Sequence, residues 1–276
     1  MISPPQQRSE PAGGRLLVDR PAQGVLRLAI SNPRKRNALD QTILDAIATV
    51  LGEESAPGSQ TRCVVVTGSD GMFSAGYEIG EITNGRFQEE AERLVAHPFT
   101  EAIEALEAFP YPTLAALPGH TIGGGLELAL ACDMRVASEQ IKLGMPPAKL
   151  GLVYSHTGLR RFIDTIGVAR TRELFLLGNY IDAQVALGWG LVNRIASEDQ
   201  FEQTALGIAG ELAANAPLSQ VGNKRVIAAL VRAQGALPAD VEAELIELRR
   251  ASFESEDLRE GMAAFAEKRA PRWRGE

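Results

Sequence analysis

The sequence predicts an α/β core followed by a region built only of helices. Short apolar strands alternate with amphipathic helices as far as about residue 195, which is the pattern of an α/β domain. From about residue 199 the strand signals stop, and four amphipathic segments follow, separated by Pro217, the turn at 235–238 and Ser255. We therefore divide the 276 residues into a disordered tail at 1–14, a core at 15–198 and a helical region at 199–276.

Each element of the core has its own signal. The polar, Pro- and Gly-rich start of the chain predicts disorder. Apolar runs, alternating or continuous, predict strands at 16–19, 25–31, 64–67, 112–117, 134–137 and 141–143. Apolar residues at helical spacing predict helices at 43–51, about 88–109 and 126–131. In the last helix of the chain, Ser255 is the expected N-cap, and the helix ends before Pro271.

Composition excludes several classes of function. A net charge of −7 and a pI near 5.2 argue against nucleic-acid binding, which needs a clustered basic face. The chain has no apolar leader and no membrane-spanning run, so we expect a cytoplasmic protein with no membrane partner. Cys63 and Cys132 lie in apolar strand-like runs and predict reduced, buried thiols. His97, His120 and His156 have no partner at ligand spacing, so we expect no metal.

Two glycine-bearing loops, each after a predicted strand, stand out as candidate functional segments. They read Thr-Gly-Ser-Asp-Gly-Met-Phe-Ser-Ala-Gly-Tyr-Glu-Ile at 67–79 and Leu-Pro-Gly-His-Thr-Ile-Gly-Gly-Gly-Leu-Glu-Leu at 117–128. Neither has the pattern of a phosphate-binding loop. Glycines that enter a helix present free N–H groups at the positive end of its dipole, which favours a developing negative charge. The alternative is a tight strand-to-helix turn that needs positive φ.

Five segments, in order along residues 15–275, resemble the crotonase (enoyl-CoA hydratase/isomerase) superfamily. They are Asn-Pro-Arg-Lys-Arg-Asn-Ala-Leu at 32–39, Phe-Ser-Ala-Gly-Tyr-Glu-Ile at 73–79, Gly-His-Thr-Ile-Gly-Gly-Gly-Leu-Glu-Leu-Ala-Leu-Ala-Cys-Asp at 119–133, Gly-Leu-Val-Asn at 190–193 and Glu-Gly-Met-Ala-Ala-Phe-Ala-Glu-Lys-Arg at 260–269. The resemblance implies a crotonase-like ββα spiral core and a helical region that assembles a homotrimer or hexamer. It also implies an acyl-CoA thioester substrate and no separate cofactor, since CoA is part of the substrate.

The same resemblance implies roles for individual residues. The backbone N–H groups of Tyr77 and Gly124 correspond to the oxyanion hole for the thioester carbonyl. Residues that correspond to the CoA-binding positions are Arg34, Lys35 and Arg36 for the phosphates, Ala38, Ala75, Tyr77 and Ile79 for the channel, and Phe265 and Lys268, which reach a neighbouring subunit's CoA. The alternatives are a solvated charge run for the basic triplet and plain helix packing for Phe265 and Lys268.

Glu127 matches the first of two catalytic glutamates in enoyl-CoA hydratases of this family. A carboxylate among leucines in the first turn of a helix suits general acid/base work, because burial raises its pKa. A favourable helix-dipole contact is the alternative. The second glutamate corresponds to Pro147, which has no proton to exchange, so the two-carboxylate hydration is in doubt.

The segment 145–154 looks most like the methylmalonyl-CoA decarboxylase branch of the superfamily. That branch also lacks the second glutamate and has a tyrosine that corresponds to Tyr154, a possible orienter of substrate carboxylate or water. Tyr77 in place of a histidine and Val153 in place of a proline depart from the branch. The resemblance therefore implies an acyl-CoA lyase, by hydration or by decarboxylation. An enoyl-CoA isomerase and an inactive CoA-binding subunit are the alternatives. His97 is a further candidate for the acyl pocket.

Overall fold

The main β-sheet organises the structure, a computed structural model that describes residues 6–78, 98–233 and 237–274. Within those residues, seven strands form this sheet in the order β1-β2-β3-β4-β5-β7-β10. Their bounds are Gln6–Ser9 (β1), Leu16–Ala22 (β2), Val25–Ile30 (β3), Cys63–Gly68 (β4), Thr113–Leu117 (β5), Met134–Ser138 (β7) and Arg194–Ala196 (β10). The first three strands pair antiparallel, and from β3 to β10 every pair is parallel.

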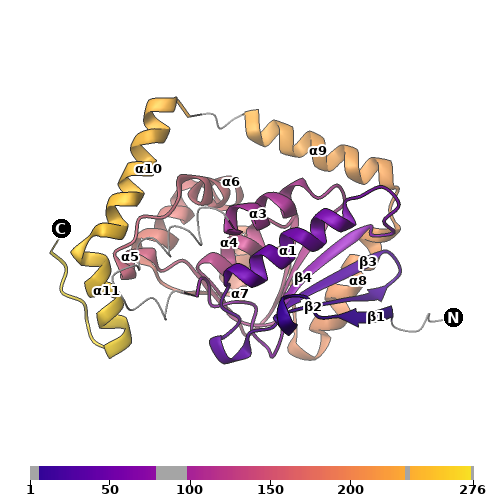
Figure 1. The fold of residues 1–276 in the computed structure, drawn as a ribbon, viewed down its shortest axis with the longest axis horizontal. Coiled ribbons are helices and arrows are strands. Elements are labelled where there is room, and N and C mark those ends of the chain that lie inside the picture. The colour runs from indigo at the N-terminus through magenta and orange to yellow at the C-terminus, as the bar shows by residue number, and fades with distance from the viewer. Residues whose placement is uncertain (1–5, 79–97, 234–236, 275–276) are drawn as a thin grey trace.

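Helices cover both faces of this sheet (Figure 1). Helices α1 (Gln41–Glu54) and α3 (Pro98–Ala108) lie on one face, and α8 (Phe201–Ala214) lies on the other. Strand β4 shows why its sequence is continuously apolar. Val64 and Val66 pack into the cluster under α1 and α3, whereas Cys63 and Val65 pack into the cluster under α8. A strand buried on both faces needs apolar residues at every position.

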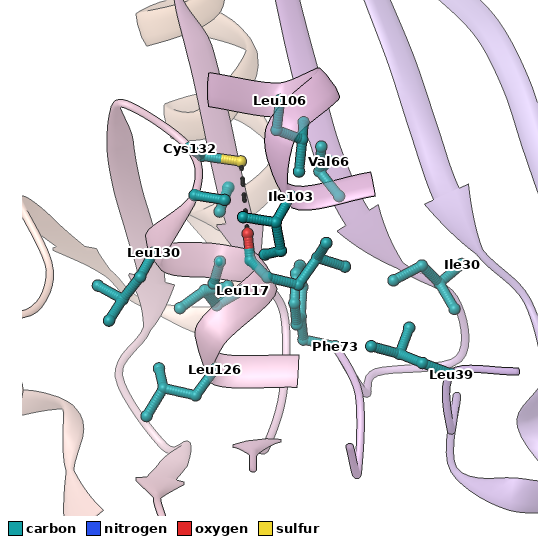
Figure 2. Close-up of a cluster of buried hydrophobic side chains, with 14 of the residues drawn as sticks. Ile30, Leu39, Val66, Phe73, Ile103, Leu106, Leu117, Leu126, Leu130 and Cys132 are labelled. Atoms are coloured by element: carbon teal, nitrogen blue, oxygen red, sulfur yellow. Dashed lines mark hydrogen bonds between the residues drawn. The ribbon is translucent and has the colours of Figure 1, made fainter. Parts of the chain in front are cut away.

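The larger apolar cluster lies where the parallel strands, α3 and α4 (Gly124–Leu130) meet (Figure 2). Ile103 and Leu106 of α3 pack there against Leu117 of β5, and Leu126 of α4 points into the same cluster. Cys132 follows α4, and its thiol contacts the Leu128 carbonyl at 4.0 Å. Cys63 and Cys132 are both free and buried, as predicted.

A second, smaller sheet fixes the start of α4. It contains β6 (Thr121–Ile122), β8 (Lys142–Gly144) and β9 (Ile181–Asp182), with β6 parallel to β8 and β8 antiparallel to β9. The helical elements beyond it are α5 (Pro147–Leu150), α6 (His156–Arg172), the turn Glu173–Leu177 and α7 (Ala183–Trp189). Short 3₁₀ turns occupy Ala12–Gly14, Pro33–Lys35 and Glu198–Gln200.

The C-terminal helices extend away from the sheet and then return to the core. Helix α9 (Pro217–Ala233) runs along one side, and α10 (Ala239–Glu254) descends to α11 (Glu256–Glu267), which packs on α5 (Figure 1). As predicted, Ser255 caps α11, since its hydroxyl accepts a hydrogen bond from Leu258 N at 3.0 Å. An α/β core with helices at the C-terminus is the fold class that the sequence predicts.

Two predictions about segments need comment. Residues 1–14 were expected to be disordered, and for the described part this is wrong. Residues 6–9 form β1 on the edge of the sheet, because their backbone groups pair with those of β2. The helix expected at about 88–109 is described from Pro98 onward as α3, and its earlier part lies outside the described residues.

Candidate functional site

The two glycine-bearing loops lie side by side because they follow neighbouring parallel strands. The first follows β4 and the second follows β5, so both leave the sheet at the same edge. Backbone hydrogen bonds join them, from Ser74 N to His120 O at 3.3 Å and from Ile122 N to Ser74 O at 3.0 Å. This pairing brings Tyr77 and Gly124 together.

Glycine is required where the loops approach most closely. Gly123 has φ 56° and ψ −128°, a left-handed backbone conformation that favours glycine and turns the chain into α4. A Cβ on Gly124 would lie 2.8 Å from the ring of Tyr77, so any side chain there would displace that ring. The tyrosine ring is fixed from its other side by Phe99, edge to face with centroids 4.8 Å apart.

Two backbone N–H groups at this junction are candidate hydrogen-bond donors. Leu39 N donates to Gly76 O at 2.7 Å and Glu78 N donates to Leu39 O at 2.9 Å, which ties the loop down on either side of Tyr77. Gly124 is the first residue of α4, where an N–H has no partner within the helix. Among the described residues, neither Tyr77 N nor Gly124 N donates to a backbone carbonyl. They are therefore free to bind an oxygen atom placed between the loops.

Glu127 lies in the first turn of α4, with a side chain that is only 3% exposed. The Tyr154 hydroxyl donates a short hydrogen bond to its Oε2 atom. Arg161 Nη1 lies 3.1 Å from its Oε1 atom, and Arg161 Nε binds Glu107 Oε1 at 2.6 Å. The Glu127 carboxylate is thus held by the phenol of Tyr154 and the guanidinium of Arg161. The charge of Arg161 is also paired with Glu107.

Burial dominates the electrostatics of this cluster. It raises the pKa of Glu127 above its ordinary value of 4.5, although the hydrogen bond from Tyr154 and the charge of Arg161 lower it in part. Burial, followed by the charge of Glu127, also raises the pKa of Tyr77 and of Tyr154. Tyr77 and Tyr154 each influence the pKa of the other, so the two phenols and the carboxylate form one electrostatically coupled, buried cluster.

Pro147 occupies the position that the resemblance assigns to a second catalytic glutamate. It is buried as the first residue of α5, and the chain then turns through Gly151, at φ 72°, toward Tyr154. Of the described carboxylates, Glu107 is the one whose charge raises the pKa of Glu127, and Arg161 already pairs with it. As far as the structure describes the chain, the site therefore has one buried carboxylate, with a tyrosine as its hydrogen-bond donor.

The basic triplet lies on the far side of the first loop. Arg34 and Arg36 are exposed, whereas Lys35 forms a short ion pair with Glu78. Ala75 N donates to Arg36 O at 3.0 Å, so this segment runs beside the first loop and Ala38 lies buried next to it. Of the predicted channel residues, Ala38, Ala75 and Tyr77 are thus brought together, and Ile79 lies outside the described residues.

The structure does not join Phe265 and Lys268 to that segment. Phe265 lies on α11 with its side chain 76% exposed, and Lys268 follows the helix in a left-handed conformation with φ 54°. No contact given for the described residues links either residue to the basic triplet. His97, a further candidate for the acyl pocket, lies outside the described residues.

Three charged residues at the site were missed by the sequence analysis. Arg161 belongs to an amphipathic helix that also carries exposed polar residues, and Glu107 is an acidic residue near the end of α3. Glu78, which pairs with Lys35 and accepts from Asn32 Nδ2 at 3.3 Å, was inside a quoted motif but was given no role. Of these three residues, only Glu78 lies in a sequence motif that could have pointed to the site.

Two features are absent from the described ranges. No group of three or more His, Cys, Asp and Glu side chains there could hold a metal ion. Likewise, none of the described helices combines the length and the apolar character that a membrane span requires.

Comparison with known proteins gives one consistent relationship. The sequence model of the enoyl-CoA hydratase/isomerase family matches residues 20–276. A probable enoyl-CoA hydratase of Bacillus subtilis (strain 168) is 34% identical over 92% of this chain and 96% of its own length. The 2,3-dehydroadipyl-CoA hydratase of Escherichia coli (strain K12) is 33% identical over 94% and 98%. A solved structure of methylmalonyl-CoA decarboxylase complexed with 2S-carboxypropyl CoA superposes with a TM-score of 0.85 at 27% identity, covering 95% of this chain and 98% of that one.

Proposed function

The chain belongs to the enoyl-CoA hydratase/isomerase family, and from this premise we propose that it binds an acyl-CoA thioester and stabilises the enolate of its acyl group. The free N–H groups of Tyr77 and Gly124 are the proposed donors to the thioester oxygen. Two fixed donors in a water-poor site lower the energy of a developing oxyanion by several kcal/mol, on the order of 3 per donor.

Decarboxylation of a 2-carboxyacyl-CoA is the reaction that we propose first. The observation that carries it is that Glu127, bonded by Tyr154, is the one buried carboxylate among the described residues of the site, with Pro147 at the second glutamate position. When the bond between the α-carbon and the carboxylate breaks, CO₂ leaves and the electron pair forms the enolate. No general base is needed for that step. The α-carbon then takes a proton from the cluster of Tyr154 and Glu127, which exchanges it with water.

Hydration of an enoyl-CoA is the second candidate, because both curated relatives above carry names of hydratases. Here Glu127 acts as the base for water that adds to the β-carbon, and the enolate takes its proton at the α-carbon. The same residue therefore serves as base and acid, with Tyr154 as the group that orients it. An isomerase would use Glu127 to move one proton between two carbons.

The test is a panel of thioesters analysed by mass spectrometry. Loss of CO₂ from a 2-carboxyacyl-CoA identifies the decarboxylase, gain of one water by an enoyl-CoA identifies the hydratase, and a shifted double bond at unchanged mass identifies the isomerase. The matched control for Glu127→Gln is Glu139→Gln, because Glu139 is exposed and away from the cluster. A chain that binds acyl-CoA but converts none of the panel would contradict the proposal and leave the inactive CoA-binding subunit.

A further inference from the structure

Arg249 is a charged side chain near the site that neither the fold nor the proposed reaction explains. It lies on α10, with its guanidinium over the ring of Phe253 at 5.6 Å. Its Nε atom is buried and has no hydrogen-bond partner among the described residues. The next residue, Arg250, differs in exposure and in pairing. Its side chain is 60% exposed and lies within ion-pair distance of Glu247 and Glu254.

Helix α10 is held directly against the segment that carries Tyr154. The Ser252 hydroxyl accepts a hydrogen bond from Val153 N at 3.0 Å and donates one to Arg249 O at 2.7 Å. Ser252 therefore connects Arg249 to Val153, the residue that precedes Tyr154. The positive charge of Arg249 acts to lower the pKa of both Glu127 and Tyr77. Arg249 thus lies on a C-terminal helix that is hydrogen-bonded to the segment carrying Tyr154.

A buried guanidinium nitrogen without a partner is unfavourable. Leaving such a donor unpaired costs about 1–3 kcal/mol or more when the group is charged. Glu127 does not satisfy this Nε atom, since no hydrogen bond joins the two groups in the described part of the chain. A bound anion can satisfy it, and the planar fork of a guanidinium fits a carboxylate with two parallel hydrogen bonds.

We propose that Arg249 binds a carboxylate carried by the acyl group of the substrate, and that it selects dicarboxylic acyl thioesters over neutral ones. This inference rests on the proposed function, since it assigns a ligand to the acyl side of that site. The new element is the residue, Arg249, that recognises the negative charge of the acyl group. In the decarboxylation, the carboxylate at Arg249 is the group that leaves as CO₂.

This assignment predicts an asymmetry between binding and turnover. An ion pair stabilises the bound carboxylate at least as well as the transition state, in which the negative charge is moving onto the thioester. Removing the guanidinium therefore raises KM for a carboxylated substrate and does not lower kcat. A residue that merely packs α10 against the core would lower kcat and stability together.

The experiment measures binding with two unreactive CoA thioethers. One is 2-carboxypropyl-CoA, and the other is its carboxamide isostere, which has the same shape without the charge. We expect the protein to bind the carboxylate form more tightly by about tenfold or more. In Arg249→Gln this preference is lost, and binding of the carboxamide form is unchanged. Arg250→Gln is the matched control and retains the full preference.

Two results would overturn the assignment. The first is an unaltered protein that binds both thioethers equally, and the second is Arg249→Gln with its preference intact. Arg249→Lys keeps the charge without the fork and serves as a folded comparison if the glutamine variant is unstable, with a reduced preference expected. The thioester panel judges the proposed function separately. A charge preference without turnover contradicts the reaction, and turnover without a preference contradicts Arg249.

Discussion

Glu127 is ionisable at a place where burial opposes its charge. Its own helix offers a favourable dipole, but the larger effects come from Tyr154 and Arg161, which bind its two oxygens. Their contributions offset only part of the cost of burial, so the pKa stays above 4.5. A carboxyl group tuned in this way can exchange protons nearer to neutral pH than an exposed glutamate can.

Glu127→Gln is expected to reduce turnover of the best substrate by about a hundredfold or more, because the amide cannot exchange a proton. Binding of acyl-CoA is expected to survive, since the proposed oxyanion donors are backbone groups. Steady-state kinetics and a direct binding measurement check the two halves separately. Full activity in this variant would make Glu127 a structural residue and move the search for the acid/base group to Tyr154.

The raised pKa of Glu127 should also make the free energy of unfolding depend on pH. Because the folded pKa of Glu127 exceeds the ordinary value, the folded state holds this proton more tightly than the unfolded state. The contribution to stability is full below about pH 4 and is lost as the pH rises through the folded pKa. Urea unfolding across this range should show the unaltered protein losing stability relative to Glu127→Gln. A constant difference between the two proteins would contradict the raised pKa.

Tyr154→Phe should move the limb of the kcat/KM profile that reports Glu127 to higher pH, which is the acidic limb if Glu127 acts as the base in hydration and the basic limb if it acts as the acid in decarboxylation. The hydrogen bond from Tyr154 lowers the pKa of Glu127, so its removal lets that pKa rise further. We also expect turnover to fall by about tenfold or more, in line with the loss of a proton donor. Tyr180→Phe is the control, because Tyr180 is 54% exposed. An unshifted limb would mean that Tyr154 has no influence on the ionisation of Glu127.

The elements around the site differ in how far the sequence predicts them. The two glycine-bearing loops and Glu127 are local motifs, and each is found where its spacing places it. The partners of Glu127 are different, because Tyr154 and Arg161 reach it through the packing of α4 against α6. No helix was predicted at the position of α6, and hydrophobic periodicity does not specify which polar residue of a helix meets its neighbour. Arg249 was missed for the same reason.

Close backbone contact between α11 and α5 gives a test at the scale of elements. A Cβ on Gly261 would lie 2.6 Å from Leu150 O, so Gly261→Ala pushes the two elements apart. We expect a loss of about 1–3 kcal/mol in unfolding free energy, with weaker selection of carboxylated ligands. Gly207→Ala on α8 is the control, since nothing lies within 4 Å of its Cβ position. Equal stability of the two variants would show that α11 does not depend on this contact.

The basic triplet gives a second test at this scale. Replacing Arg34, Lys35 and Arg36 together with glutamine should weaken binding of acetyl-CoA, and the loss should shrink as salt is added. Lys35 is paired with Glu78, so the exposed arginines are expected to carry most of the effect. Calorimetry at two ionic strengths checks this prediction. Unchanged affinity for acetyl-CoA at low salt would mean that the triplet is a solvated charge run and does not bind CoA.

At the scale of the whole molecule, α9 points to assembly. It has no buried residue in the described chain, and Val226, Ile227 and Leu230 are each more than half exposed. Apolar residues gathered on one helix are typical of a surface that another subunit covers. We therefore predict a trimer or a dimer of trimers, measured as mass in solution at micromolar concentration. Ile227→Glu combined with Leu230→Glu should reduce that mass, and a monomeric unaltered protein would contradict the prediction.

The return of α10 and α11 to the core also has a consequence for how the protein is made. The main sheet and both glycine-bearing loops are complete by residue 196, but Arg249 and the helix that supports Tyr154 come from the last part of the chain. Domains generally fold as units, and the N-terminal parts of a protein fold first during synthesis. A nascent chain can therefore form the oxyanion loops before it has the side chain that we propose reads the substrate's charge. Selectivity would be acquired only on release, so chains cut short by premature termination would be CoA-binding proteins without discrimination.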